Sequence, residues 1–256
     1  TTGVRLFNQY FESMTGTTVN LKLKQIQDES NSHVYFISNA GDLGEIVDEA
    51  TLKIHALPYT STDEGLPNDN LCRMVGMWEG KVVATGMKDI EVELTRLLAK
   101  ITFTYSMGEG FTFTPISVAL RSVPDKSQVT APTTQLSGLS YGTYSGTASA
   151  DGATIYWYLP ENMAGTVSGP DAVDSEKKKT GTGVTNATCI ELTGTAVQGG
   201  VRYEEVTFRF YPGSSMNNYD IIRNSHYTMS VTLVGIDVSD ERITVGKIPP
   251  IIVDEG

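Results

Sequence analysis

The sequence predicts a mainly β protein built from β-sandwiches, and three observations support this. Apolar and polar residues alternate with a period of two at 101–105, 206–211 and 227–233, which is typical of strands with one buried face. The 256 residues include 31 Thr and 25 Gly, and only 19% are charged, a composition that favours strands and turns. The spacers 122–153 and 161–187 are rich in Ser, Thr, Gly, Asp and Pro.

Two helices are expected near the N-terminus. Residues 4–14 place apolar side chains at helical spacing, which predicts a short amphipathic helix. The stronger pattern covers 43–57, where Asp42 and Glu45 form a capping box and Pro58 ends the apolar stripe.

Strand patterns surround these helices and then take over the chain. Because the helical patterns stop before residue 98, we expect one domain at 1–98 and an all-β domain at 99–256. In chain order, the predicted strands cover 19–23, 34–37, 72–78, 81–85, 90–105, 111–120 with Pro115 inside, 154–159, 206–211 and 227–233.

The charge and the cysteines exclude several kinds of protein. A net charge of −11 argues against binding to nucleic acid or to an anionic membrane surface, since both require clustered cations. The chain has no run of 18 apolar residues, so the sequence predicts no membrane-spanning helix. Cys72 and Cys189 are too few for a disulfide framework or a zinc site, and we expect buried free thiols.

The sequence offers little for catalysis. The three histidines, His33, His55 and His226, belong to no metal or nucleophile motif, and no phosphate-binding glycine loop is present. An acidic loop at 63–70 is expected to be solvated rather than to hold a metal ion. We therefore expect a protein that is not an enzyme and that needs no cofactor or metal.

One aromatic segment has two interpretations. Tyr156, Trp157 and Tyr158 are consecutive and could form a platform on which sugar rings stack. Because neighbours on a strand face opposite sides, at least one of them is expected to be exposed or at an interface. The alternative, which we favour, is that Trp157 packs in the core and the tyrosines are partly exposed.

Four segments together resemble the fimbrillin family of Bacteroidetes, the subunits and accessory proteins of type V pili. They are Leu94 to Ile101 (LTRLLAKI), Tyr158 to Met163 (YLPENM), Tyr219 to Tyr227 (YDIIRNSHY) and Val34 to Gly41 (VYFISNAG). Each is weak alone, but their order and spacing over 34–236 make the resemblance specific.

The motif residues are expected to support the scaffold. Arg96 and Lys100 are predicted to pair with acids on neighbouring strands. Asn224, together with Glu161 and Asn162, is predicted to hydrogen-bond turn backbone. The complete set is Arg96, Ala99, Lys100, Ile101, Pro160, Glu161, Asn162, Arg223, Asn224 and Tyr227.

The resemblance implies two transthyretin-like, Greek-key β-sandwich domains and a non-catalytic subunit of a fimbrium on the cell outer membrane. It also implies a lipoprotein precursor, although this sequence shows no signal peptide or lipid-carrying Cys at Thr1. In the family scheme, proteolysis after an Arg removes an N-terminal strand, and the groove accepts a strand from another pilus subunit or a second copy. Surface glycans or proteins are possible further partners. The alternative function is a surface carbohydrate-binding module.

The C-terminal segment 243–256 is the expected donor arm. Its apolar residues would be costly to leave in water, and Pro249 and Pro250 fit an edge strand or an extended arm. The alternative, which stays open here, is that 243–248 completes the sheet of its own domain. The candidate donor residues are Ile243, Val245, Ile248, Ile251 and Val253.

Overall fold

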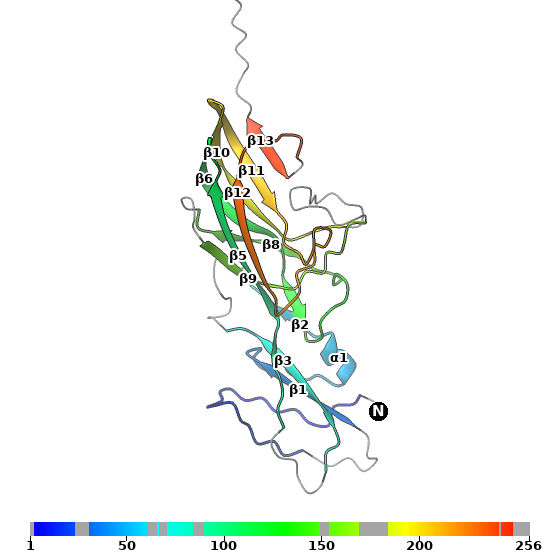
Figure 1. Cartoon of the computed structure of the whole chain (residues 1–256). Coiled ribbons are helices and arrows are strands. Elements are labelled where there is room, and N and C mark those ends of the chain that lie inside the picture. The colour runs from blue at the N-terminus through cyan, green and yellow to red at the C-terminus, as the bar shows by residue number, and fades with distance from the viewer. Residues whose placement is uncertain are drawn as a thin grey trace, which may run out of the picture.

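The computed structural model is rich in strands and has one short helix, α1 (Figure 1). It describes residues 3–23, 31–60, 66, 71–83, 90–148, 154–168, 184–240 and 242–247. A large β-sandwich lies at one end, and the sheet containing β1 and β3 lies at the other (Figure 1). The predicted mainly β sandwich fold is confirmed.

The larger sheet of the sandwich has five antiparallel strands in the order β13-β11-β10-β6-β8. Pro115 lies inside β6 because the pairing with β10 shifts register beside it, between Thr193 and Gly194. A side chain at Gly194 would come within 2.3 Å of the Thr114 carbonyl oxygen, so the shift requires glycine there. The strands are β6 (Phe111–Pro124), β8 (Tyr141–Gly146), β10 (Cys189–Gln198), β11 (Val201–Phe210) and β13 (Ile243–Lys247).

The second sheet has three strands in the order β12-β5-β9. The central strand β5 (Leu98–Met107) runs parallel to β12 (His226–Leu233) and antiparallel to β9 (Thr154–Pro160). Its inward side chains meet those of the five-stranded sheet in the main core. Trp157 is 0% exposed there, and its Nε1 donates to the Ser145 carbonyl oxygen of β8 at 2.9 Å.

The N-terminal part has a smaller sheet in the order β1-β3-β4. Its strands are β1 (Ser32–Ser38), β3 (Met74–Gly80) and β4 (Thr95–Arg96). A separate pair joins β2 (Ala56–Pro58) to β7 (Lys126–Gln128). Leu57, Leu97 and Val129 form a small core under β1 and β3, and they come from both sides of residue 98. The domain division near residue 98 therefore stays a prediction.

The helix prediction at 43–57 is largely wrong. Gly44 has a φ of +67°, which an α-helix does not allow, and Asp42 accepts a hydrogen bond from its N–H in a turn rather than forming a capping box. The helix α1 covers only Glu49–Lys53. Its N-cap is Asp48, whose carboxylate accepts a hydrogen bond from a first-turn N–H at 2.7 Å.

Residues 4–14 are not helical either. Val4 forms an isolated bridge with Asp48, and the apolar residues around it are exposed. A single short helix needs a surface to pack on, and this segment has no buried apolar face to dock.

Most predicted strands are confirmed, with shifted ends. The strand expected at 90–105 begins only at Thr95, and no strand forms at 19–23 or 81–83. The rest of the strand predicted at 81–85, together with most of the loop 63–70, lies outside the described residues. The spacer 122–153 holds β7 and β8, which its polar composition concealed.

No helix in the described part of the chain is long and apolar enough to cross a membrane.

Both cysteines are thiols. Cys189 is buried, and burial raises the pKa of the half-buried Cys72.

Glu49 attaches α1 to β1. Its Oε1 lies 2.8 Å from Lys53 Nζ, accepts from the Tyr35 hydroxyl at 2.8 Å, and lies 2.7 Å from His33 Nδ1. These contacts, with Lys53 the strongest, lower the pKa of Glu49 from 4.5 to about 2. The carboxylate therefore stabilises the folded chain only while it is ionised.

We expect Glu49→Gln to lower the free energy of unfolding at pH 7 by ~1 kcal/mol or less, since the group is partly solvated. Because the folded pKa of Glu49 lies below the ordinary one, the difference in the free energy of unfolding between the two chains has its full size above about pH 4.5. It shrinks as the pH falls towards 2. Urea unfolding at several pH values measures this difference. Glu45→Gln, on the exposed loop before α1, is the control; an effect of Glu49→Gln that does not depend on pH would contradict the assignment.

Candidate functional site

Three of the motifs found in the sequence meet at one place, which we name the motif junction: Arg96, Glu161, Asn162, Arg223 and Asn224. The backbone N–H of Asn224 donates to the Leu98 carbonyl oxygen at 2.9 Å, and Arg96 Nη1 donates to Asn224 Oδ1 at 3.2 Å. Asn162 and Ile221 exchange two backbone hydrogen bonds, at 2.9 and 2.8 Å. Segments more than 120 residues apart in sequence are thus joined where β4 and β9 end and β5 begins.

A buried ion pair lies at the centre of the motif junction. The guanidinium of Arg223 donates to both carboxylate oxygens of Glu161, with Nε to Oε2 at 3.1 Å, and the two side chains are 5% and 1% exposed. It also donates to the carbonyl oxygens of Gln128 at 2.7 Å and Val129 at 3.1 Å. Burial raises the pKa of Glu161, and the attraction of Arg223 opposes that rise.

Asn162 extends the motif junction into neighbouring loops. It is 0% exposed, and its side-chain amide donates to the Asn186 carbonyl oxygen at 2.8 Å and to Thr188 Oγ1 at 2.9 Å. Thr188 Oγ1 in turn donates to the Ser122 carbonyl oxygen at 3.0 Å. The end of β9 is therefore fixed to the end of β6 and to the loop that enters β10.

The remaining motif residues are structural. Ala99 and Ile101 are 0% exposed in the main core, and Pro160 is buried at the end of β9. The hydroxyl of Tyr227 accepts from the Ile222 N–H at 2.9 Å, which closes the turn before β12. The prediction that Lys100 pairs with an acid is wrong, because the Lys100 ammonium lies over the rings of Tyr156 and Tyr158.

The prediction that Glu161 hydrogen-bonds turn backbone is incomplete, because the main partner of its carboxylate is the Arg223 guanidinium. Sequence reasoning missed this ion pair, although the acid and the base both belong to quoted motifs. The opposite charges of Glu161 and Arg223, in two of the quoted motifs, were the available indication.

We expect Glu161→Gln and Arg223→Met each to lower the free energy of unfolding by about 3–5 kcal/mol, because each leaves a buried polar or charged partner uncompensated. The double variant should cost less than the sum. Urea unfolding followed by Trp fluorescence measures all three. Glu204→Gln, in the exposed pair with Arg202, is the control and should change stability by about 0.5 kcal/mol or less. Strictly additive effects would contradict the coupling.

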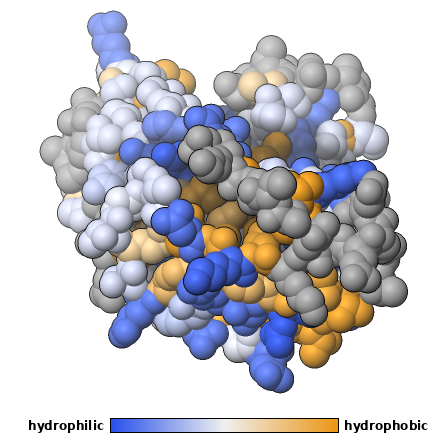
Figure 2. All heavy atoms as spheres, turned by 90° about the horizontal axis from the view of Figure 1, so that it is seen from below, coloured by the Kyte–Doolittle hydropathy of each residue, from blue (hydrophilic) through white to orange (hydrophobic). Residues whose placement is uncertain are grey.

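Apolar residues are exposed mainly in the N-terminal part of the chain. Of the 31 buried hydrophobic residues in the described part of the chain, only four precede residue 98, whereas twelve of the 19 exposed large hydrophobic residues described do. Seen from this end, apolar side chains gather around a hollow in the middle of the surface (Figure 2). The exposed N-terminal set, here named the apolar end, is Val4, Leu6, Phe7, Tyr10, Met14, Val47, Ile54, Leu71, Met77, Val83, Ile90 and Leu94.

The small N-terminal sheet has apolar residues on both faces. One face packs Tyr35, Ile37 and Val75 on the small core. The other carries Val34 and Phe36, with Trp78 directly opposite Val34. These side chains are half-buried and belong to none of the buried clusters of the described residues. In the same part of the structure, β1 has a neighbouring strand on one side only.

The C-terminal arm begins as a strand of its own sheet. Ile243 and Val245 lie on β13, pair with Phe208 and Val206 of β11, and pack against the main core. The expectation that these two residues belong to a donor strand is therefore wrong, since their pairing partners are in the same chain. Ile248, Ile251 and Val253 lie outside the described residues.

The predicted aromatic platform cannot include Trp157, because its ring is fully buried. Tyr156 and Tyr158 both lie on the side of the strand opposite Trp157, where Tyr156 is 42% exposed and Tyr158 is half-buried. The alternative with a core tryptophan and partly exposed tyrosines is the one that the structure bears out.

The described residues contain no group of three or more His, Cys, Asp or Glu that could hold a metal ion. Two histidines make structural contacts: His33 with Glu49, and His226, whose Nε2 lies 2.8 Å from Thr102 Oγ1. The residues of the motif junction therefore act as a scaffold.

Comparison with known proteins agrees with this description. A family model described as a domain of unknown function (DUF4906) matches residues 157–231, which include Glu161 and Arg223. Among curated proteins, none matches the sequence significantly. The tip fimbrial protein Mfa3 from Porphyromonas gingivalis, with C-terminal truncation, gives a TM-score of 0.54 at 15% identity, over 83% of this chain and 77% of that one.

A protein from Parabacteroides distasonis, provisionally described as a cell adhesion protein, gives a TM-score of 0.53 at 14% identity, over 85% of this chain and 82% of that one. At these identities the likeness shows a shared fold. The resemblance to fimbrillins is thus confirmed at the level of the fold.

Proposed function

We propose that this chain is a non-catalytic structural subunit or accessory adhesin of a cell-surface fimbria, joined to its neighbours by exchange of β-strands. The observation that carries the proposal is the incomplete core of the N-terminal part. The fold shared with a tip fimbrial protein supports it. The partners are other pilus subunits or further copies of this chain, and the location is the fimbrium at the cell outer membrane.

The acceptor is the N-terminal sheet. A sheet with apolar residues on both faces needs cover on both. Here the face with Tyr35 and Ile37 packs on the small core, whereas the face with Phe36 and Trp78 meets segment 92–94 at Gly76 and packs on no buried cluster of the described residues. An incoming strand pairs with the open side of β1 through main-chain hydrogen bonds. Its apolar side chains cover Phe36, Trp78 and the apolar end. This explains why the exposed hydrophobic residues concentrate there.

The donor is the segment that follows β13. Residues 248–256 read IPPIIVDEG and lie outside the described residues. Because β13 belongs to its own sheet, the donor in this proposal starts after Lys247, later than the residue composition alone suggested. Four apolar residues in this segment, Ile248, Ile251, Ile252 and Val253, supply the side chains for the acceptor pockets.

We expect purified chain to form ladders of oligomers that survive SDS without boiling, and deletion of 248–256 to abolish them while the monomer stays folded. Leu94→Glu on the apolar end should also abolish the ladder, because it places a charge in an apolar interface. Gel electrophoresis and size-exclusion chromatography measure the oligomers.

The matched control is Val201→Glu on β11, since Val201 is 42% exposed and Leu94 is 38% exposed. Its ladder should equal that of the parent chain. Oligomers that persist in the tail deletion, or that are lost equally in Val201→Glu, would refute strand exchange through these two surfaces.

A further inference from the structure

The outer face of the sheet β12-β5-β9 is built almost entirely of hydroxyl groups and tyrosine rings. Alternation puts every second residue of β12, β5 and β9 on this face, and the strands are in register, with Thr228 beside Thr102 and Thr102 beside Tyr156. We name it the hydroxyl face: Lys100, Thr102, Thr104, Ser106, Thr154, Tyr156, Tyr158, His226, Thr228, Ser230 and Thr232. None of these eleven residues, all within described strands, is a carboxylate.

The hydroxyl groups are ordered in pairs across the strands. Ser106 and Thr232 hydroxyls lie 3.2 Å apart, and those of Thr104 and Thr154 lie 3.4 Å apart. A hydroxyl has one donor and two acceptor sites, so a single contact of this kind leaves capacity for a ligand. Between Lys100 and Ser106 the face extends for about 20 Å, since a strand rises ~3.3 Å per residue.

The tyrosines are held in place at one end of the hydroxyl face. The rings of Tyr156 and Tyr158 meet edge to face, with centroids 6.2 Å apart and planes at 87°. The Lys100 ammonium lies 5.2 Å from the first centroid and 5.6 Å from the second. Cation–π contacts of this kind fix both rings before a ligand arrives.

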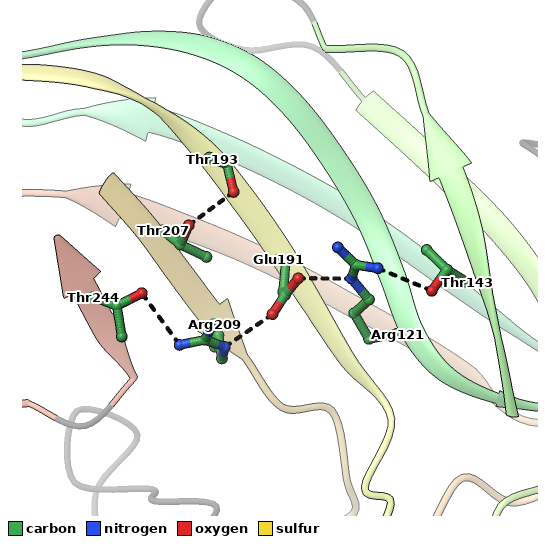
Figure 3. Close-up of polar contacts among 7 residues, drawn as sticks. All are labelled: Arg121, Thr143, Glu191, Thr193, Thr207, Arg209 and Thr244. Atoms are coloured by element: carbon green, nitrogen blue, oxygen red, sulfur yellow. Dashed lines mark hydrogen bonds and ion pairs between the residues drawn. The ribbon is translucent and has the colours of Figure 1, made fainter. Parts of the chain in front are cut away.

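The outer face of the five-stranded sheet is built differently, although it also contains threonines. There Glu191 binds Arg121 at 2.6 Å and Arg209 at 2.9 Å, and the network continues to Thr143 and Thr244, so that it crosses all five strands (Figure 3). Burial raises the pKa of Glu191, but the hydrogen bonds from the two arginines outweigh it and lower that pKa. The charged face satisfies itself internally, whereas the hydroxyl face presents uncharged groups to solvent.

We propose that the hydroxyl face binds a neutral polysaccharide, laid along β5 with a sugar ring on Tyr156. Sugars present apolar C–H faces to aromatic rings and hydroxyls that donate and accept, which matches alternating rings and Thr or Ser hydroxyls. A neutral chain fits because the face has a single lysine engaged with two rings, and because the net charge of −11 repels polyanions. This inference is independent of strand exchange.

The test is affinity electrophoresis of the full chain in gels containing galactomannan, xylan, starch or dextran, with polygalacturonate and hyaluronan as acidic probes. At least one neutral polysaccharide should retard the protein, with retardation unchanged by added salt. Tyr156→Ala with Tyr158→Ala should weaken binding about tenfold or more through loss of the ring contacts. Tyr10→Ala, which removes a tyrosine that is 51% exposed on the apolar end, should leave the retardation by the polysaccharide unchanged.

The double tyrosine variant should keep the thermal stability and the SDS ladder of the parent, which separates this result from any failure of strand exchange. Three outcomes would overturn the proposal. They are no retardation by any neutral polysaccharide, retardation only by acidic probes with strong salt dependence, and retardation that the double variant does not reduce.

Discussion

The ion pair between Glu161 and Arg223 is the interaction on which the joining of the sheets depends. Arg223 lies just before β12, Glu161 lies just after β9, and the same guanidinium binds two carbonyl oxygens at the end of β7. Since β7 pairs with β2, the Arg223 side chain connects the sheet β12-β5-β9 to the strand pair β2-β7. A buried charge pair is stable only when every partner is present, so the geometry of this region is strongly specified.

The two ends of the molecule differ in how completely they bury their apolar residues. In the large sandwich, both sheets turn their inward residues to one core, and most of the outward residues are polar. In the N-terminal part, one short sheet has apolar residues on both faces and only a small core under one of them. This difference is the physical basis for assigning assembly to the N-terminal end and a rigid scaffold to the sandwich.

The sequence predicted strands best where one face is buried. Alternation located β9, β12 and the second half of β11, because the main core enforces the period of two. It failed at 43–57, where apolar spacing was helical but Gly44 and the pairing of β2 with β7 divided the segment. It also missed β10, together with β7 and β8, whose polar residues reveal pairing only when the partner strand is known.

The sequence by itself determined the mainly β fold, the absence of a recognisable catalytic motif, and the motifs that resemble fimbrillins. Period-two patterns and residue types carry that information locally. Only the tertiary structure decided that Glu161 binds Arg223, that Trp157 is in the core, and that Ile243 belongs to its own sheet. Those outcomes depend on contacts between residues far apart in sequence, where burial and strand order, and not local pattern, select the partner.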